Sequence, residues 1–394
     1  MARATKFFLS IGIAIVLLCC SFAFYLYLPT REILPTYFNY SKTDLNLLRA
    51  LDSSQEITQK NLMKWDQIMF DLIKENKLGD VYASRIYAYV YTAQRDAVFL
   101  SHNVKHTFMG SIEPVSAAVL CLFFTDSCSS IKEQINSINN DKFSNSLSKI
   151  VMKNIIIRMQ QDKNQSHLYD EPKVNKSHWI GIQPYYGEEV GSWKTWLIKS
   201  GHEFIAPPPP ASNSVEWHTQ VDLVLHALKH ITPDQINQVI FWAGNPSTVT
   251  PPGIWLIFAN DYMNLHEVGL EKTLYVRSVL AMSIADSVIT VFNSKYTYWV
   301  KRPFMRNPSI HTIMPTPNHP SYPAGHSTLS ATAAAILTYF FPQNGNEWKK
   351  LASIASKGRV WGGIHFPIDA KQGALLGNEV GDAIIHQLPL LPDE

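Results

Sequence analysis

Cysteine, charge and strand-like patterns are all scarce in this chain of 394 residues. Four cysteines exclude a disulfide-dense scaffold and a zinc ribbon built on cysteine. Charged residues make up 17% of the chain and the formal net charge is +2, so charge gives no support to nucleic acid as a partner. The chain is rich in apolar residues, which make up 46% of it and are enough for a sizeable core.

Three common catalytic signatures are also missing. The sequence has no HExxH metal-binding pair, no phosphate-binding Walker loop and no Gly-x-Ser-x-Gly nucleophile elbow. Alternation of apolar and polar residues, which would indicate strands, is rare. The sequence therefore favours an all-α protein whose chemistry depends on other residues.

Residues 7–28 form an uncharged apolar stretch that follows Arg3 and Lys6. About 20 apolar residues in a helix span a ~30 Å hydrocarbon layer, and the preceding cations favour a cytoplasmic amino terminus. We therefore predict that residues 1–30 are a membrane anchor or a signal segment. The stretch is longer than the core of a typical signal peptide, about 7–15 residues. This favours an anchor, with a cleaved signal as the alternative.

Either reading exports residues 31–394 to the periplasm or another extracytoplasmic space, tethered to the inner membrane if the anchor is retained. Cys121 and Cys128 are the only cysteines in that part of the chain. An oxidising compartment permits a bridge between them, and two buried thiols fit the sequence equally well.

Helical periodicity dominates the exported part. Apolar residues recur at three and four positions in 65–73, and further helical runs occupy 81–99, 114–124 and 132–162. Residues 161–210 are rich in proline, glycine, tryptophan and tyrosine and predict a long irregular connection, of a kind that is often functional. We predict an all-α fold made of helical bundles. Residues 31–213 would form an N-terminal helical region with this connection, and residues 214–394 a catalytic bundle.

The first of three chemical motifs contains Lys295 and Arg302, followed by Pro303. The two cations are seven residues apart, two helical turns, so we expect both on one face of a helix that the proline ends. Such a pair could bind an anion or form an ordinary solvated basic face.

The second motif, Pro323-Ala324-Gly325-His326, leads into an alanine-rich run. A helix amino terminus presents free N–H groups and a positive dipole end, which suit an anion. Gly325 would let the backbone approach a ligand closely. The alternative for His326 is an ordinary turn or cap residue.

The third motif contains Arg359, His365 and Asp369, with Pro367 predicted to open a helix. The planar guanidinium of Arg359 suits an oxyanion. Asp369 lies four residues after His365 and could accept its second ring N–H, which would fix the tautomer. Together the three motifs supply three cations, two imidazoles and a helix terminus, a set that could surround one tetrahedral oxyanion.

The order Lys-x6-Arg-Pro, Pro-x-Gly-His and Arg-x5-His-x3-Asp resembles the superfamily of type 2 phosphatidic acid phosphatases (PAP2), bacterial acid phosphatases and vanadium-dependent haloperoxidases. The stretch from Trp361 to Asp369 is most similar to the bacterial haloperoxidase-like branch. Weaker similarity extends upstream to residues 241–255 and 191–193, and to Trp65 with residues 83–85. The resemblance implies the helical core of that superfamily and a small-molecule substrate.

For the haloperoxidase branch, the resemblance implies vanadate as cofactor, with His365 as its protein ligand. Lys295 would polarise bound peroxide, and His326 would move protons while halide is oxidised by hydrogen peroxide. The resemblance also implies the groups that hold the oxyanion, namely Lys295, Arg302, Gly325, His326 and Arg359.

The alternative activity is hydrolysis of phosphate monoesters, which requires no cofactor. His365 would then form a phosphohistidine, Asp369 would stabilise its imidazolium, and His326 would act as acid and then as base. A third possibility is an inactive phosphate-binding protein. The oligomeric state, the halide or ester, and cleavage of the anchor stay open.

Three positions depart from the family pattern. Ala324 stands where the family usually has a serine, whose hydroxyl would donate to an oxyanion oxygen. Such a bond is worth roughly 1.5–3 kcal/mol. Gly358 replaces a serine before Arg359, and Lys301 replaces a tryptophan before Arg302. The first change weakens the expected activity, and the third adds a cation near the site.

Overall fold

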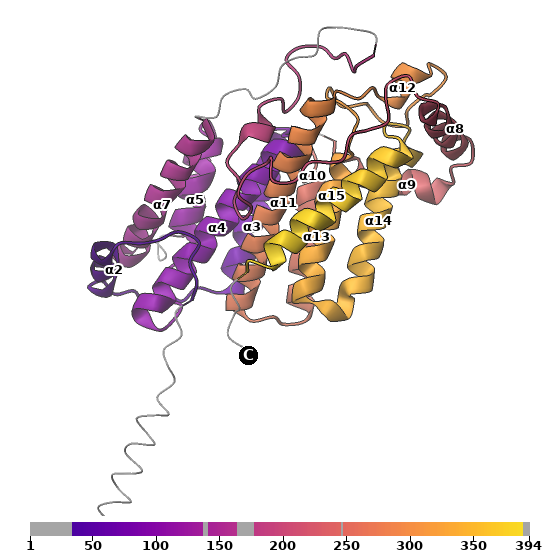
Figure 1. The fold of residues 1–394 in the computed structure, drawn as a ribbon. Coiled ribbons are helices and arrows are strands. Elements are labelled where there is room, and N and C mark those ends of the chain that lie inside the picture. The colour runs from indigo at the N-terminus through magenta and orange to yellow at the C-terminus, as the bar shows by residue number, and fades with distance from the viewer. Residues whose placement is uncertain (1–33, 137–140, 164–176, 246, 389–394) are drawn as a thin grey trace, which may run out of the picture.

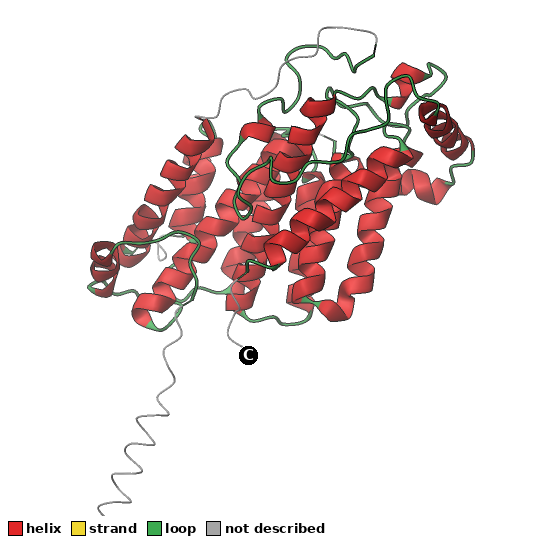
Figure 2. Cartoon of the chain, in the orientation of Figure 1, coloured by secondary structure: helices red, strands yellow, loops and turns green. Residues whose placement is uncertain are grey.

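The computed structural model describes residues 34–136, 141–163, 177–245 and 247–388. The predicted anchor or signal segment, residues 1–30, lies outside these ranges. Within them the chain forms helices and no named strand, so the all-α prediction is confirmed (Figure 2). One isolated antiparallel bridge joins Glu56 and Met109.

The helices are arranged side by side in a broad bundle (Figure 1). The N-terminal region contributes α2 (Lys42–Arg49), α3 (Gln59–Glu75), α4 (Asp80–Lys105), α5 (Glu113–Phe123), α6 (Cys128–Glu133) and α7 (Lys142–Lys163). The C-terminal region contributes α8 (Glu216–Lys229), α9 (Pro233–Ala243), α10 (Thr250–Leu265), α11 (Leu270–Tyr298), α12 (Pro303–Arg306), α13 (Gly325–Phe340), α14 (Gly345–Trp361) and α15 (Pro367–Ile385).

Helix α11 is the central element and packs against both α4 and α13. Among the described residues, Leu270–Arg306 is the one stretch long and apolar enough to cross a membrane, and its most apolar part is entirely buried in the protein. Its composition is that of a core helix, because a helix covered on all sides has no face that needs polar residues.

Buried apolar side chains from both predicted regions form one continuous cluster, which runs from Leu34 to Ile384. The cluster crosses the boundary at residues 213 and 214, so the two regions share a core. The division into two regions at residues 213 and 214 stays a prediction, based on composition and helical periodicity.

The expectation of one helix carrying both Lys295 and Arg302 is wrong. Helix α11 ends at Tyr298, and Trp299 adopts a left-handed conformation with φ 47°. The Trp299 ring packs between Tyr185 and Tyr296, with centroid distances of 5.5 and 5.2 Å. Arg302 is extended and precedes Pro303, the first residue of α12, because a residue before proline disfavours the α conformation.

The long connection is irregular, as predicted, and its described part is fixed to α11. The buried carboxylate of Asp286 accepts hydrogen bonds from the backbone N–H groups of residues 196, 197 and 198, at 2.6, 2.7 and 3.1 Å. Burial raises the pKa of Asp286 to about 7, although these three donors lower it. The connection also contains Tyr186, whose N–H donates to the Asn318 oxygen at 2.9 Å.

Cys121 and Cys128 form a disulfide that joins α5 to α6, which settles a question the sequence left open.

Candidate active site

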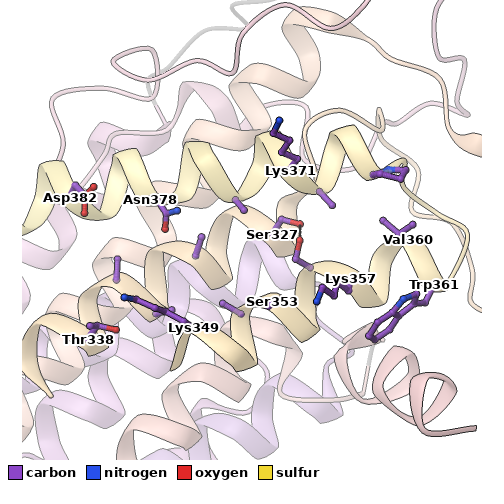
Figure 3. Close-up of a pocket in the computed structure, with 18 of the residues that line it drawn as sticks. Ser327, Thr338, Lys349, Ser353, Lys357, Val360, Trp361, Lys371, Asn378 and Asp382 are labelled. Atoms are coloured by element: carbon purple, nitrogen blue, oxygen red, sulfur yellow. Dashed lines mark hydrogen bonds between the residues drawn. The ribbon is translucent and has the colours of Figure 1, made fainter. Parts of the chain in front are cut away.

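Two of the cavities in the described part of the chain bear on the choice of site. The larger, about 1050 Å³, is a groove between α13, α14 and α15, lined by alanines, serines and three lysines (Figure 3). It contains none of the predicted site residues. The smaller cavity, about 280 Å³, is lined by Gly325, His326, Arg359 and His365, which the sequence analysis had selected. The smaller cavity is therefore the candidate active site.

His365 has its tautomer fixed by its neighbours. Its Nδ1 lies 3.0 Å from Oδ2 of Asp369, and its Nε2 lies 3.0 Å from Nη1 of Arg302. Because arginine can only donate, Nε2 must accept, and the ring proton lies on Nδ1 and is donated to Asp369. The one lone pair of Nε2 therefore accepts from Arg302 in this structure, and a ligand bonded to Nε2 would replace that hydrogen bond.

Asp369 is fully buried and is held by more than His365. Its Oδ2 also accepts from the Ser321 hydroxyl at 2.5 Å and from the Phe366 N–H at 3.1 Å. Ser321 is absent from the predicted site, because no local spacing connects it with a carboxylate 48 residues later. The pKa of Asp369 is raised to about 6 by burial, against the lowering effect of these donors.

Arg302 lies behind the cavity wall and joins two histidines. Besides His365 it donates through Nη2 to Nδ1 of His319 at 3.1 Å, and it also donates to the backbone oxygens of His319 and Ile364. His319 lines the cavity and was left out of the predicted site. Burial lowers the pKa of Arg302 to about 9, Asp369 opposes this change, and Arg359 adds to it.

Lys295 also lies behind the wall, and all three of its ammonium protons have acceptors. Nζ donates to the backbone oxygens of Pro320, Ser321 and Pro323 at 3.0, 2.9 and 2.6 Å. The residue is fully buried and is not part of the cavity lining. Its ammonium therefore fixes the turn that leads into α13 and adds a positive charge to the site from behind.

His326 and Arg359 lie in the cavity wall and both approach the Trp242 carbonyl at the end of α9. The Nε2 of His326 lies 2.9 Å from that oxygen, and Nη1 of Arg359 lies 3.3 Å from it. The carbonyl can only accept, so Nε2 of His326 carries the ring proton and Nδ1 is the nitrogen left for proton transfer. Nε of Arg359 is buried without an acceptor in the described part of the chain.

Gly325 is the first residue of α13, as the sequence predicted, and Ala324 is its N-cap. A Cβ at Gly325 would come no closer than 3.9 Å to another side chain. Glycine is therefore not demanded by protein packing here, and its missing side chain leaves space in the cavity. The first turn of α13 also has N–H groups without intrahelical acceptors.

The crowded cations shape the electrostatics of the site. Burial, reinforced by Arg302, Lys295 and Arg359, lowers the pKa of His365 well below its ordinary value. Burial and then Arg359 lower the pKa of His326 in the same way. Both imidazoles are therefore neutral near pH 7, and an anion placed among these cations would relieve their repulsion.

The cavity residues from outside the predicted motifs include Asp80 at the start of α4, Tyr186 in the connection and Phe292 on α11. No sequence signal marks Asp80 or Tyr186, because both are more than 100 residues from the motifs and only packing brings them there.

Known proteins resemble this chain in two ways, in the sequence of its C-terminal region and in its overall fold. Residues 275–390 match the family model of the PAP2 superfamily. An undecaprenyl-diphosphatase from Sulfolobus acidocaldarius is 29% identical over 113 residues, 27% of this chain and 53% of the relative. The bacitracin transport permease protein BcrC from Bacillus licheniformis is 26% identical over 106 residues, 27% of this chain and 51% of the relative. The chain thus spans about half the length of the curated relatives it matches.

Solved structures share the fold over much more of the chain. A bacterial vanadium-dependent iodoperoxidase superposes with a TM-score of 0.74 at 20% identity, covering 87% of this chain and 100% of that one. A holo-type bacterial vanadium-dependent chloroperoxidase gives a TM-score of 0.64 at 14% identity, covering 78% and 92%. The resemblance predicted from the sequence is confirmed: residues 275–390 match the PAP2 superfamily, within a fold that the chain shares with bacterial vanadium-dependent haloperoxidases.

Proposed function

We propose that the chain is a phosphatase that hydrolyses small phosphate monoesters through a phosphohistidine at His365. The observation that carries the proposal is the tautomer of His365: Asp369 holds the proton on Nδ1, and the unprotonated Nε2 belongs to a cavity that Arg359 also lines, with Arg302 behind the wall. These are the groups that phosphoryl transfer to a histidine requires, and all are side chains of this protein.

In the first step, Nε2 of His365 forms a bond to phosphorus while the bond from phosphorus to the alcohol oxygen breaks. Arg359 and the first turn of α13 would stabilise the phosphoryl oxygens from the cavity wall, and Arg302 would add positive charge from behind it. Protonated His326 would give the proton from Nδ1 to the leaving oxygen. The bound dianion favours this protonated form, because it offsets the repulsion from Arg359 that lowers the pKa of His326.

In the second step, water attacks phosphorus and the bond to His365 breaks. His326, now neutral, takes a proton from that water, and inorganic phosphate leaves. Asp369 stabilises the positive charge on the phosphorylated imidazole throughout, because its Oδ2 is 3.0 Å from Nδ1.

One observation favours this activity over halide oxidation. The three protons of Lys295 are donated to backbone oxygens, so this ammonium is not directed at bound peroxide. The proposed hydrolysis does not depend on that contact, because Arg359 and the first turn of α13 line the cavity themselves.

The second candidate is a vanadium-dependent haloperoxidase, favoured by the fold shared over both regions. Vanadate fits the residues present: His365 offers a lone pair, Nε of Arg359 lacks an acceptor in the described part of the chain, and Gly325 leaves space. Bound there, it would supply Lewis-acid activation of hydrogen peroxide. His365, Arg302 and Arg359 would hold it.

We further propose that the enzyme acts outside the cytoplasm, attached to the membrane through residues 7–28. The disulfide between Cys121 and Cys128 supports export, because such bonds persist in oxidising compartments. A cavity of about 280 Å³ suits a small ester, since it lies just below the usual size of ligand pockets, about 300–1,000 Å³.

The test uses the full-length purified chain, stripped of metal, in two parallel assays. One follows phosphate release from p-nitrophenyl phosphate, and the other follows bromination of an activated diketone with hydrogen peroxide, bromide and added orthovanadate. We expect phosphate release that orthovanadate inhibits. Vanadate-dependent bromination without ester hydrolysis would replace the proposal by the second candidate.

A further inference from the structure

One part of the cavity wall carries negative charge and aromatic rings instead of cations. It consists of Asp80, Tyr186 and Phe292, which come from α4, the long connection and α11. The proposed hydrolysis gives none of these residues a task. Their chemistry differs from that of the oxyanion-binding residues and points to a different part of the substrate.

The Asp80 carboxylate is held in place by two donors. Its Oδ1 accepts from the Tyr186 hydroxyl at 2.9 Å and from the Val81 N–H at 3.0 Å. Asp80 is also the first residue of α4, where the helix dipole stabilises negative charge.

Gly79 makes the approach of Tyr186 possible. A Cβ at this position would lie 2.0 Å from the Tyr186 hydroxyl oxygen, a distance that real structures exclude. Tyr186 is fixed from its backbone too, because its N–H donates to the Asn318 oxygen at 2.9 Å and its own oxygen accepts from Tyr296 at 2.8 Å. The pair of carboxylate and phenol is thus a fixed part of the wall.

Aromatic rings accompany the carboxylate. The rings of Tyr186 and Phe292 lie 6.3 Å apart at 66°, and Phe292 is buried. Aromatic faces attract ammonium groups, and a carboxylate beside them adds a direct ionic partner. A wall with this composition recognises a cation.

The Asp80 carboxylate and the Arg359 guanidinium line one cavity without forming an ion pair. Among the described residues no ion pair joins Asp80 to Arg359 or Lys295. The charge of Asp80 nevertheless acts on Lys295 and Arg359. Burial lowers the pKa values of both residues, and Asp80 opposes this lowering. The cavity is therefore dipolar, and it suits a small ligand with an anion at one end and a cation at the other.

We propose that Asp80, Tyr186 and Phe292 form a cation-binding subsite, and that the preferred substrate is a phosphate monoester of a small amino alcohol. The ammonium group binds at this subsite while the phosphate binds beside His365. The inference rests on the proposed function for turnover, and its binding component can be measured independently of turnover.

The test compares two ligands that differ in one group. Binding of 2-aminoethylphosphonate and propylphosphonate, which cannot be hydrolysed as esters, is measured by calorimetry on the full-length chain. Release of phosphate from phosphoethanolamine and propyl phosphate is measured in parallel. The variants are Asp80→Asn and Tyr186→Phe. Asp382→Asn, in the outer groove, is the control for a lost surface carboxylate.

We expect the ammonium ligand to bind at least about tenfold more tightly than its neutral analogue, as for a charge-assisted contact of 1.5 kcal/mol or more. Asp80→Asn should bring this ratio toward one, Tyr186→Phe should reduce it less, and Asp382→Asn should retain it.

Equal affinities for the two phosphonates, or an unchanged ratio in Asp80→Asn, would overturn the inference while ester hydrolysis continued. A clear ammonium preference without hydrolysis of either ester would support the subsite and refute the proposed function. Failure of both phosphonates to bind would refute both.

Discussion

The charged groups of the candidate site fall into two sets that differ in what they contact. His326, Arg359 and His365 line the cavity, and Arg359 has a donor without an acceptor in the described part of the chain. Lys295 and Asp369 lie behind the wall, where the Lys295 ammonium and Oδ2 of Asp369 are hydrogen-bonded to the protein. This difference indicates that the residues lining the cavity contact the ligand. The residues behind the wall hold the lining residues in position and change their pKa values.

The largest effect is expected from removing the lone pair that the proposal makes the nucleophile. His365→Ala should reduce ester hydrolysis by about 10³-fold or more, since residual rates after loss of a nucleophile come from binding alone. Steady-state phosphate release measures this. His386→Ala, at the exposed end of α15, is the matched control and should retain full activity. Comparable rates in the two variants would show that His365 does not react.

Arg359→Gln should weaken binding of phosphate and orthovanadate by roughly 10- to 100-fold, because one charge-assisted contact is worth about 1.5–3 kcal/mol. Thermal stability should change little, since Arg359 makes a single long hydrogen bond at 3.3 Å. Calorimetric titration and thermal unfolding of the same sample measure both quantities. A large fall in melting temperature with unchanged affinity would mean that Arg359 supports the cavity wall and does not contact the ligand.

Lys295→Met should show the opposite pattern. It leaves three buried backbone oxygens without their donor, and each unsatisfied group costs about 1–3 kcal/mol. Part of this is recovered, because the buried ammonium no longer has to be desolvated. We expect a net loss of roughly 3 kcal/mol in the free energy of unfolding, measured in denaturant. Unchanged stability with abolished anion binding would mean that Lys295 contacts the ligand.

The pH dependence tests the link between the two sets. Burial raises the pKa of Asp369 to about 6, so the carboxylate is charged above this pH and takes up a proton below it. Once protonated, it no longer stabilises a positive imidazole at His365. The value of kcat/KM should therefore fall about tenfold per pH unit below pH 6. A profile that stays flat down to pH 4.5 would disagree with this assignment.

The smallest effect concerns Ala324, at the position where the family usually has a serine. Ala324 is fully buried at the N-cap of α13, and its N–H donates to the Asp369 backbone oxygen at 3.0 Å. Because the other donors remain, Ala324→Ser should raise kcat/KM only severalfold, as one additional hydrogen bond of about 1 kcal/mol would. A gain of a hundredfold or more would indicate that the native site is impaired and would favour the interpretation as a binding protein.

Much of the fold could be predicted because helix formation is local. The apolar positions around Trp65 recur with helical spacing, and α3 forms there. Gly325 begins α13 and Pro367 begins α15, as their sequence signals indicated. The helix through Lys295 was predicted to continue to Pro303, but it ends at Tyr298. The sequence could not show this, because the ring of Trp299 packs against Tyr185, more than 100 residues earlier.

By itself the sequence determined what happens within a turn or two of helix. His365 and Asp369 are four residues apart at the start of α15, so their hydrogen bond follows from local geometry. The tertiary structure decided which groups face the ligand. It placed the Lys295 ammonium against the carbonyls of residues 320–323, and it brought Asp80 and Tyr186 into the wall. The physical reason is that packing of α11 against α4 and α13 joins segments whose separation along the chain carries no periodic signal.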